Sequence, residues 1–144
     1  EAGDTRAPLA TLAPTADLIS LHCPLTEQTR HLINKELLDS LNPGTLLINC
    51  ARGGIIDEAA ALAALRRGQL GGLGVDVLPE EPPRQGHALL YALQDSLNLI
   101  VTPHNAWITP EARQTVIEMT AANLRQPLVE NIGKSTGSLT RSDS

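Results

Sequence analysis

Aromatic side chains are almost absent from this sequence, which has no phenylalanine, one tryptophan and one tyrosine among its 144 residues. Its core must therefore be built from aliphatic side chains. Hydrophobic residues make up 42% of the chain and charged residues 19%, which is the balance of an ordinary globular protein. This length suffices for one compact domain with a real core and is too short for two domains of ordinary size.

Positive charge is also scarce, because 11 lysines and arginines face 16 aspartates and glutamates and leave a formal net charge of −5. No basic stripe is available to neutralise phosphates, which argues against a nucleic-acid partner or an anionic membrane surface. No apolar run approaches the length of a membrane span, and the residues after Glu1 lack signal-peptide character. We therefore expect a cytoplasmic protein that binds small molecules or other proteins.

Cysteine is rare as well, and both residues, Cys23 and Cys50, stand at the end of an apolar run. The sequence has no CxxC motif and no Cys/His spacing typical of a metal site, so we expect no bound metal. Free thiols in a reducing cytosol are the simplest interpretation.

Four apolar runs predict four strands, near residues 17–22, 45–50, 73–78 and 97–101. Helices are predicted between or after them, at 35–41, 58–67, 89–93 and 111–124. Asn34 and Asp57 are candidate N-caps, and three glycines, Gly68, Gly71 and Gly72, are expected to break the chain before the third strand. Strands that alternate with helices are typical of an α/β fold with a parallel sheet and right-handed crossovers.

The composition also suggests a division of the chain. Residues 1–15 are rich in Ala, Pro and Thr and are expected to be an entry linker with one short helical turn. Residues 16–126 form the folded part. Residues 127–144 are rich in Ser, Thr and Gly without periodicity, which predicts a disordered tail.

Polar residues that could do chemistry follow the ends of the predicted strands. Because the carboxyl ends of parallel strands meet at one edge of a sheet, Arg52, Asp76 and His104 are expected to lie near one another. Arg52 could hold a carboxylate through two parallel hydrogen bonds, on backbone that two glycines allow to bend. His104, beside a glutamate, could give a proton to a developing alkoxide.

Each of these residues also has a simpler interpretation. Arg52 could be an exposed loop arginine, and His104 could be a structural hydrogen-bonding group. Glu80 and Glu81 could be solvated loop charges. Asp76 is harder to explain in this way, because a carboxylate within an apolar run is costly to bury without a partner, so we expect it to face a ligand or a partner.

Three motifs resemble, in order, the signatures of the D-isomer-specific 2-hydroxyacid dehydrogenases. They are Asn-Cys-Ala-Arg-Gly-Gly-Ile-Ile-Asp at 49–57, Gly-Val-Asp-Val-Leu-Pro-Glu-Glu-Pro at 74–82 and Val-Thr-Pro-His-Asn-Ala-Trp at 101–107. The similarity spans roughly residues 16–124, and residues 104–113 are most similar to the glycerate dehydrogenase, or hydroxypyruvate reductase, branch.

The resemblance implies a role for each matching residue. Arg52 would bind the substrate's carboxylate and carbonyl oxygen, His104 would be the acid and base, and Glu81 would be the partner of the histidine, which leaves Glu80 as surface charge. NAD or NADP would be the cofactor, with NAD preferred. The residues implied in binding it are Cys23 and Pro24 on the adenosine side, Cys50, Ala51 and Ala106 along its backbone, Asp76 at the nicotinamide end, and Thr29 as a lesser candidate.

The resemblance also shows what is missing. The sequence contains no Gly-x-Gly-x-x-Gly, which seats the pyrophosphate in this family. We therefore expect an incomplete Rossmann-like domain, without the first βαβ unit and without the substrate domain, that is poorly active alone. The full-length protein is expected to be a homodimer that interconverts a small 2-keto acid of the hydroxypyruvate or glyoxylate type and its D-2-hydroxy acid.

Two other functions remain open. Carboxyl-terminal binding protein corepressors share this fold and a similar Thr-Pro-His-x-Ala-Trp run, so the chain could be an NAD-sensing module that binds proteins. It could also be an inactive truncated fragment.

Overall fold

The computed structural model describes residues 7–125 of the chain. It divides them into two compact units, the first ending at Asn105 and the second beginning at Ala106.

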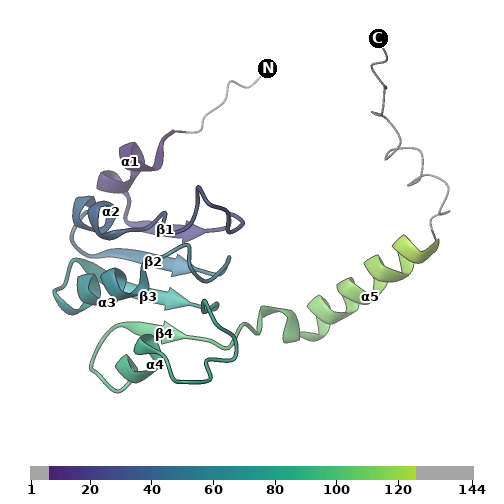
Figure 1. Cartoon of the computed structure of the whole chain (residues 1–144). Coiled ribbons are helices and arrows are strands. Elements are labelled where there is room, and N and C mark those ends of the chain that lie inside the picture. The colour runs from purple at the N-terminus through teal and green to yellow at the C-terminus, as the bar shows by residue number, and fades with distance from the viewer. Residues whose placement is uncertain (1–6, 126–144) are drawn as a thin grey trace, which may run out of the picture. The chain divides into compact units, whose positions relative to one another are not determined.

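The first unit is an α/β structure whose strands form one parallel sheet in the order β1-β2-β3-β4 (Figure 1). Its elements are α1 (Leu9–Leu12), η1 (Ala13–Thr15), β1 (Leu18–Leu21), α2 (Lys35–Ser40), β2 (Thr45–Asn49), α3 (Glu58–Arg66), β3 (Leu70–Val75), α4 (Ala88–Ala92) and β4 (Leu99–Val101). The predicted fold class is therefore confirmed, with strands and helices in the predicted order.

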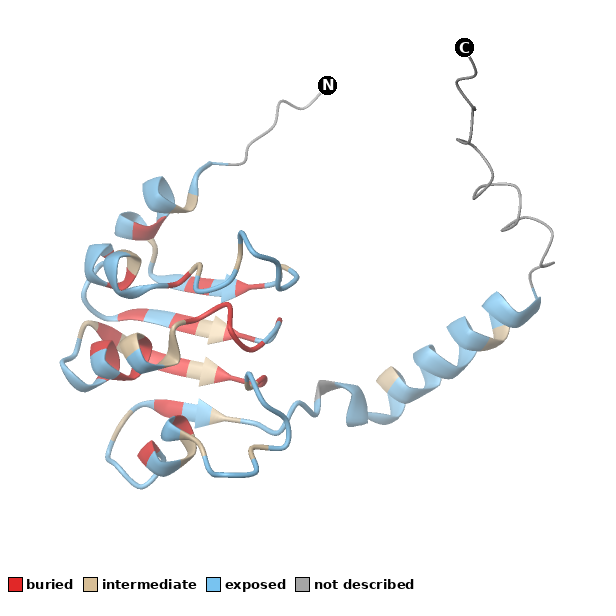
Figure 2. Ribbon diagram, viewed as in Figure 1, coloured by how far each residue is buried: buried red, intermediate tan, exposed pale blue. Residues whose placement is uncertain are grey.

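Buried residues alternate with more exposed ones along β1 and β2, so one face of the sheet lies against the core (Figure 2). The inward side chains of the strands include Ile19, Leu21, Leu47, Leu73, Val75 and Leu99. On the other face, Leu46 is 39% exposed and Ile100 is 63% exposed. This exposure corrects an expectation from the sequence. The unbroken apolar run at residues 45–48 predicts a strand buried on both faces, whereas among the described residues the helices cover one face of the sheet only.

The third strand begins earlier than the sequence suggests. It starts at Leu70 and includes Gly71 and Gly72, which were expected to break the chain. A Cβ on Gly71 would lie 2.3 Å from the carbonyl oxygen of Gly44, and one on Gly72 would lie 2.6 Å from Asn98 Nδ2. These glycines therefore allow close approach to neighbouring segments rather than ending the strand.

We expect Gly71→Ala to destabilise the fold by roughly 1–3 kcal/mol, because the new methyl group meets backbone that can move only with the turn at Gly44. Gly74→Ala is the matched control in the same strand, since its Cβ would meet Ile48 only at 3.8 Å, an ordinary contact. Urea denaturation of both variants measures the difference. Equal midpoints for the two variants would contradict the steric explanation.

The helices begin where the sequence predicts. The Asn34 side chain accepts a hydrogen bond from the backbone N–H of Leu37 at the start of α2, and Asp57 accepts one from Ala60 at the start of α3. Gly68, which follows the end of α3, has a φ of +77°, a conformation that favours glycine.

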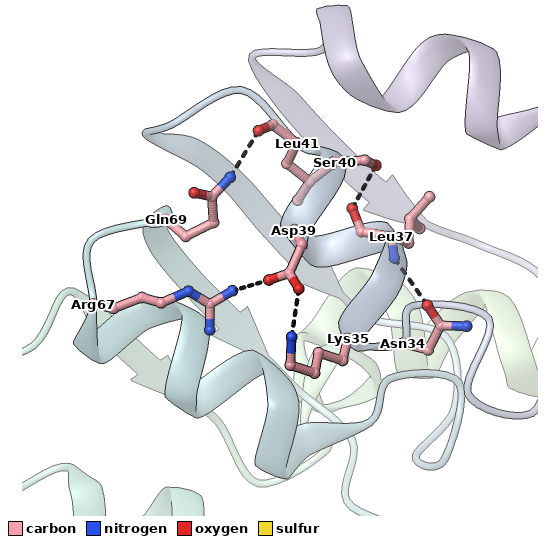
Figure 3. A network of polar contacts seen from close by, with 8 residues as sticks. All are labelled: Asn34, Lys35, Leu37, Asp39, Ser40, Leu41, Arg67 and Gln69. Carbon is pink, nitrogen blue, oxygen red and sulfur yellow. Dashed lines mark hydrogen bonds and ion pairs between the residues drawn. The ribbon is translucent and has the colours of Figure 1, made fainter.

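A surface network links the end of α3 to α2 (Figure 3). Lys35 and Arg67 both donate to the carboxylate of Asp39, which lowers the pKa of that carboxyl, mainly through the bond from Lys35. Gln69 Nε2 donates to the carbonyl oxygen of Leu41 at 2.7 Å. The charged groups are exposed, so the network serves more to set the direction of the chain into β3 than to add stability.

The segment at 1–15, predicted to be a linker, contains the expected helical turn, since its described residues form α1 and η1. Within η1, Ala13 is fully buried in the core of the first unit. The predicted tail at 127–144 lies outside the described residues.

The second unit contains η2 (Ala106–Ile108) and α5 (Pro110–Arg125), which confirms the helix expected at 111–124. Within residues 7–125, no helix has the length and apolar character that crossing a membrane requires.

Candidate active site

The candidate residues of the first unit follow the carboxyl ends of neighbouring parallel strands (Figure 1). Cys23 and Pro24 follow β1, Arg52 follows β2, Asp76 follows β3 and His104 follows β4. Because the strands are parallel and adjacent, these positions share one edge of the sheet, as the sequence predicts.

His104 and Glu81 are in direct contact. The imidazole Nδ1 lies 2.7 Å from Glu81 Oε2, and the other carboxylate oxygen accepts a hydrogen bond of 2.7 Å from the backbone N–H of Leu78. The bond from His104, and then that from Leu78, hold the pKa of Glu81 below its ordinary value. Glu81 is therefore a carboxylate at neutral pH and can stabilise a proton on the imidazole.

The backbone also positions His104. Its φ of +49° lies in the left-handed region, a backbone conformation that residues other than glycine seldom adopt. Glu80, the neighbour of Glu81, is exposed. Of the two glutamates, His104 thus contacts Glu81, the one that the motif resemblance implies as its partner.

Asp76 is buried, at 8% exposed, and lies directly after β3 rather than within the strand as predicted. Its Oδ1 accepts hydrogen bonds from the hydroxyl of Thr102 and, at 3.4 Å, from the backbone N–H of Asn105. Thr102 and Asn105 flank His104 in the sequence. The carboxylate therefore holds the segment that carries the histidine, and these hydrogen bonds compensate for the burial of its charge.

Asn49 fixes the turn that carries Arg52. Its side chain is 1% exposed, and its Nδ2 donates to the carbonyl oxygen of Arg52 at 3.0 Å while its Oδ1 accepts from the N–H of Ala51 at 3.1 Å. The sequence analysis did not assign this role. The available signal was an amide at the end of an otherwise apolar strand, which must find hydrogen bonds when buried.

Arg52 itself is exposed at the edge of the sheet. Its Nη1 donates to the carbonyl oxygen of Ala51 at 2.6 Å. A guanidinium has five N–H donors, so this single bond does not exhaust its capacity to bind an anion.

Gly53 brings the arginine turn against the segment that leads to Glu81. A Cβ at this position would lie 2.2 Å from the carbonyl carbon of Leu78 and 2.3 Å from the nitrogen of Pro79. Only a glycine permits this approach of the two backbones. The turn after β2 and the loop after β3 are therefore packed directly together.

The residues implied in cofactor binding differ in their surroundings. Ala51 is buried, Cys23 is half-buried and Cys50 is exposed. Thr29 uses its hydroxyl within its own loop, where it donates to the carbonyl oxygen of Pro24 at 2.7 Å and accepts from the N–H of Thr26 at 2.7 Å. Its place in a cofactor site stays a prediction, as does that of Ala106, which begins the second unit.

Comparison with known protein families gives one match that covers most of the chain. Residues 1–106 match the family described as D-isomer specific 2-hydroxyacid dehydrogenase, NAD binding domain.

Among curated proteins, the chain is 46% identical over 116 residues to glycerate dehydrogenase of Methylorubrum extorquens, covering 81% of this chain and 36% of that protein. It is 48% identical over 120 residues to (S)-sulfolactate dehydrogenase of Chromohalobacter salexigens, covering 83% and 38%.

A solved structure of a D-isomer specific 2-hydroxyacid dehydrogenase from Xanthobacter autotrophicus, in complex with NADPH and MES, is similar with a TM-score of 0.61 at 37% identity. That match covers 83% of this chain and 49% of the solved chain. The chain thus spans little more than a third of the length of the curated relatives named above.

Proposed function

This chain belongs to the D-isomer-specific 2-hydroxyacid dehydrogenases, and we propose from that membership that its protein interconverts a small 2-keto acid and the D-2-hydroxy acid. The observation that carries the proposal is the contact between Glu81 and His104, at the edge of the sheet where Arg52 also lies. A cation, an imidazole and a supporting carboxylate are the groups that reduction of a keto acid requires.

In the proposed reaction Arg52 binds the carboxylate of the keto acid through two parallel hydrogen bonds and so orients the neighbouring carbonyl group. Protonated His104 donates its proton to the carbonyl oxygen as that oxygen gains negative charge. Glu81 binds the ring at Nδ1, and we assign the proton transfer to Nε2, the second nitrogen of the imidazole. In the reverse direction, neutral His104 removes the proton from the hydroxyl group.

NAD(H) would accept or supply the hydride when bound. After β1 come Cys23 and Pro24, and directly after β2 come Cys50 and Ala51. These small, uncharged side chains let a dinucleotide approach the carboxyl ends of the strands, so they fit this cofactor. We propose that Cys23, Pro24, Thr29, Cys50, Ala51, Asp76 and Ala106 contribute to its site. We favour NAD over NADP, although the Xanthobacter relative was solved with NADPH.

Hydroxypyruvate and glyoxylate are the substrates that we propose. The relatives reported above are dehydrogenases, so the alternative of a corepressor-like binding module is not favoured. The homodimer and the cytoplasmic location stay predictions.

The proposed function is tested by the loss of NADH absorbance when the full-length protein is mixed with hydroxypyruvate or glyoxylate. We expect turnover with at least one of them, and pyruvate and NADPH serve as comparisons. A protein that binds NADH tightly but reduces none of these acids would overturn the proposal and favour the binding module.

We expect Glu81→Gln to move the falling, high-pH limb of the pH–rate profile for reduction to lower pH by about one unit, because a neutral amide no longer stabilises the imidazolium. The carboxyl of Glu81 has a lowered pKa, so its charge is present at neutral pH and is lost only as the pH falls through that lowered value, below 4.5. Steady-state rates measured across about pH 5 to 9, which includes the range of about pH 5 to 8 in which histidine ordinarily titrates, report the shift.

Glu80→Gln is the matched control for this prediction. It removes the same charge from the adjacent, exposed position, so a general electrostatic effect of the loop would shift both profiles equally. Equal shifts would contradict the specific pairing of Glu81 with His104.

A further inference from the structure

A second histidine–glutamate pair lies outside the site described above. Nε2 of His87 lies 2.8 Å from Oε2 of Glu58, and the two side chains are 18% and 12% exposed. Glu58 is the first residue of α3, and His87 is the N-cap of α4. The pair therefore joins the starts of two helices that follow different strands.

The hydrogen bonds of His87 define its protonation. Its Nδ1 accepts a bond of 3.3 Å from the backbone N–H of Leu89, so this nitrogen carries no proton. Nε2 therefore carries a hydrogen and donates a hydrogen bond to Oε2 of Glu58. The same imidazole thus caps α4 on one side and holds Glu58 on the other.

The carboxyl group of Glu58 is only partly satisfied by hydrogen bonds. Its Oε1 is buried and has no hydrogen-bond partner among the residues that the structure describes. Burial raises the pKa of this carboxyl, while the facing histidines His87 and His31 oppose the increase and Asp57 adds to it. A buried carboxylate oxygen without a hydrogen-bond partner destabilises the folded state. Stability alone therefore does not explain why Glu58 is buried beside His87.

The pair lies at one end of the loop that carries Glu81. At the start of this loop, Gly53 packs against the backbone of Leu78. At its end, Glu58 binds His87. Both anchors come from the short segment that follows Arg52, from Gly53 to Glu58.

Between these anchors the loop is held mainly by the hydrogen bonds that Glu81 forms with the N–H of Leu78 and with His104. Most of its side chains, including Glu81, are exposed, and the bond from the Tyr91 hydroxyl to the carbonyl oxygen of Gln85 is long, at 3.4 Å. The position of Glu81 therefore depends on how the two ends of its loop are held.

We propose that Glu58 is a positioning residue, which through its bond to His87 holds the loop of Glu81 in the place where this carboxylate meets His104. The inference rests on the proposed function, since it assigns to Glu58 a part in holding Glu81 against the acid–base histidine. It also links the arginine turn to the histidine's partner, because the segment from Gly53 to Glu58 continues directly from Arg52.

Three variants of the full-length protein test the proposal. Glu58→Ala removes the bond, whereas Glu58→Gln keeps an oxygen that accepts from Nε2 of His87. His87→Asn keeps a capping oxygen for the N–H of Leu89 and is too short to reach Glu58. We expect Glu58→Ala and His87→Asn to lower kcat by about 10-fold to 100-fold with little change in KM, and Glu58→Gln to retain most of the activity.

Two readouts separate positioning from a merely structural role. The variants without the bond should move the high-pH limb of the pH–rate profile in the same direction as Glu81→Gln. Glu58→Ala added to Glu81→Gln should cause little further loss, because the two changes act on the same interaction. Fully additive losses, or an unchanged profile with only a lower melting temperature, would overturn the proposal.

One measurement is independent of turnover. The ¹⁵N NMR signal of His104 Nδ1 reports its hydrogen bond to Glu81, and we expect this signal to change in Glu58→Ala and His87→Asn but not in Glu58→Gln. If the wild type reduces no keto acid, the proposed function fails while this signal still tests Glu58. If Glu58→Ala does not fold, His87→Asn, which retains the cap of α4, decides the question through the same readouts.

Discussion

Replacing His104 with asparagine is expected to lower kcat for keto acid reduction by about 10²-fold to 10⁴-fold, because the reaction loses its positioned proton donor. Asparagine tolerates the left-handed backbone that His104 adopts at a φ of +49°, so the fold should survive the change. The affinity for NADH should be nearly unchanged. Steady-state kinetics with hydroxypyruvate, together with a fluorescence titration of NADH, measure the two effects.

The chain offers a matched control for this substitution. His31 has a φ of +48°, so His31→Asn makes the same chemical change on the same kind of backbone at an exposed position. It should leave kcat within about threefold of the wild type, since His31 has no part in the proposed proton transfer. A His104→Asn variant as active as His31→Asn would refute the role of His104 as proton donor.

Much of the fold follows from local signals in the sequence. The apolar runs locate the strands, and side chains at Asn34 and Asp57 cap the helices as expected, because capping is a short-range interaction. The sequence did not predict the start of β3 correctly, because that start depends on long-range contacts. What keeps Gly71 and Gly72 in the strand is the approach of Gly44 and Asn98, which are distant in sequence.

In the candidate site, too, some features could be predicted from the sequence and others could not. The strand ends place Arg52, Asp76 and His104 at one edge, and the motif resemblance selects Glu81 rather than Glu80. The supporting contacts were not predictable, because they join loops that a linear pattern does not relate. Asp76 was expected to face a ligand or a partner, and its carboxylate accepts a hydrogen bond from Thr102, whose position beside it depends on the pairing of β3 with β4.

These supporting contacts link the turn after β2 to the loop after β3. Asn49 fixes the turn of Arg52 from within β2, and Gly53 packs that turn against Leu78, whose N–H binds Glu81. The groups proposed to bind the substrate and to transfer the proton are thereby connected through backbone contacts rather than through side chains alone. A change on either loop is expected to affect both functions, so kinetic effects must be divided between KM and kcat before a role is assigned.

Arg52→Ala is the substitution for which this division matters most. The loss of two charge-assisted hydrogen bonds, each contributing about 1.5–3 kcal/mol, is expected to lower kcat/KM for hydroxypyruvate by about 10²-fold to 10⁴-fold, mainly through KM. Arg52→Lys should recover only part of the loss, because an ammonium group keeps the charge but cannot form the parallel pair of bonds.

Arg84→Ala controls for net charge, since Arg84 is an exposed arginine on the loop of Glu81, and it should change kcat/KM by less than about threefold. A substrate analogue with an amide in place of the carboxylate adds a second test. If Arg52 acts by binding the carboxylate, the wild type and Arg52→Ala should reduce this analogue at similar, low rates. An equal loss on both substrates would instead mean that the substitution disturbs the loop of Glu81 through Gly53, and that Arg52 does not select the acid.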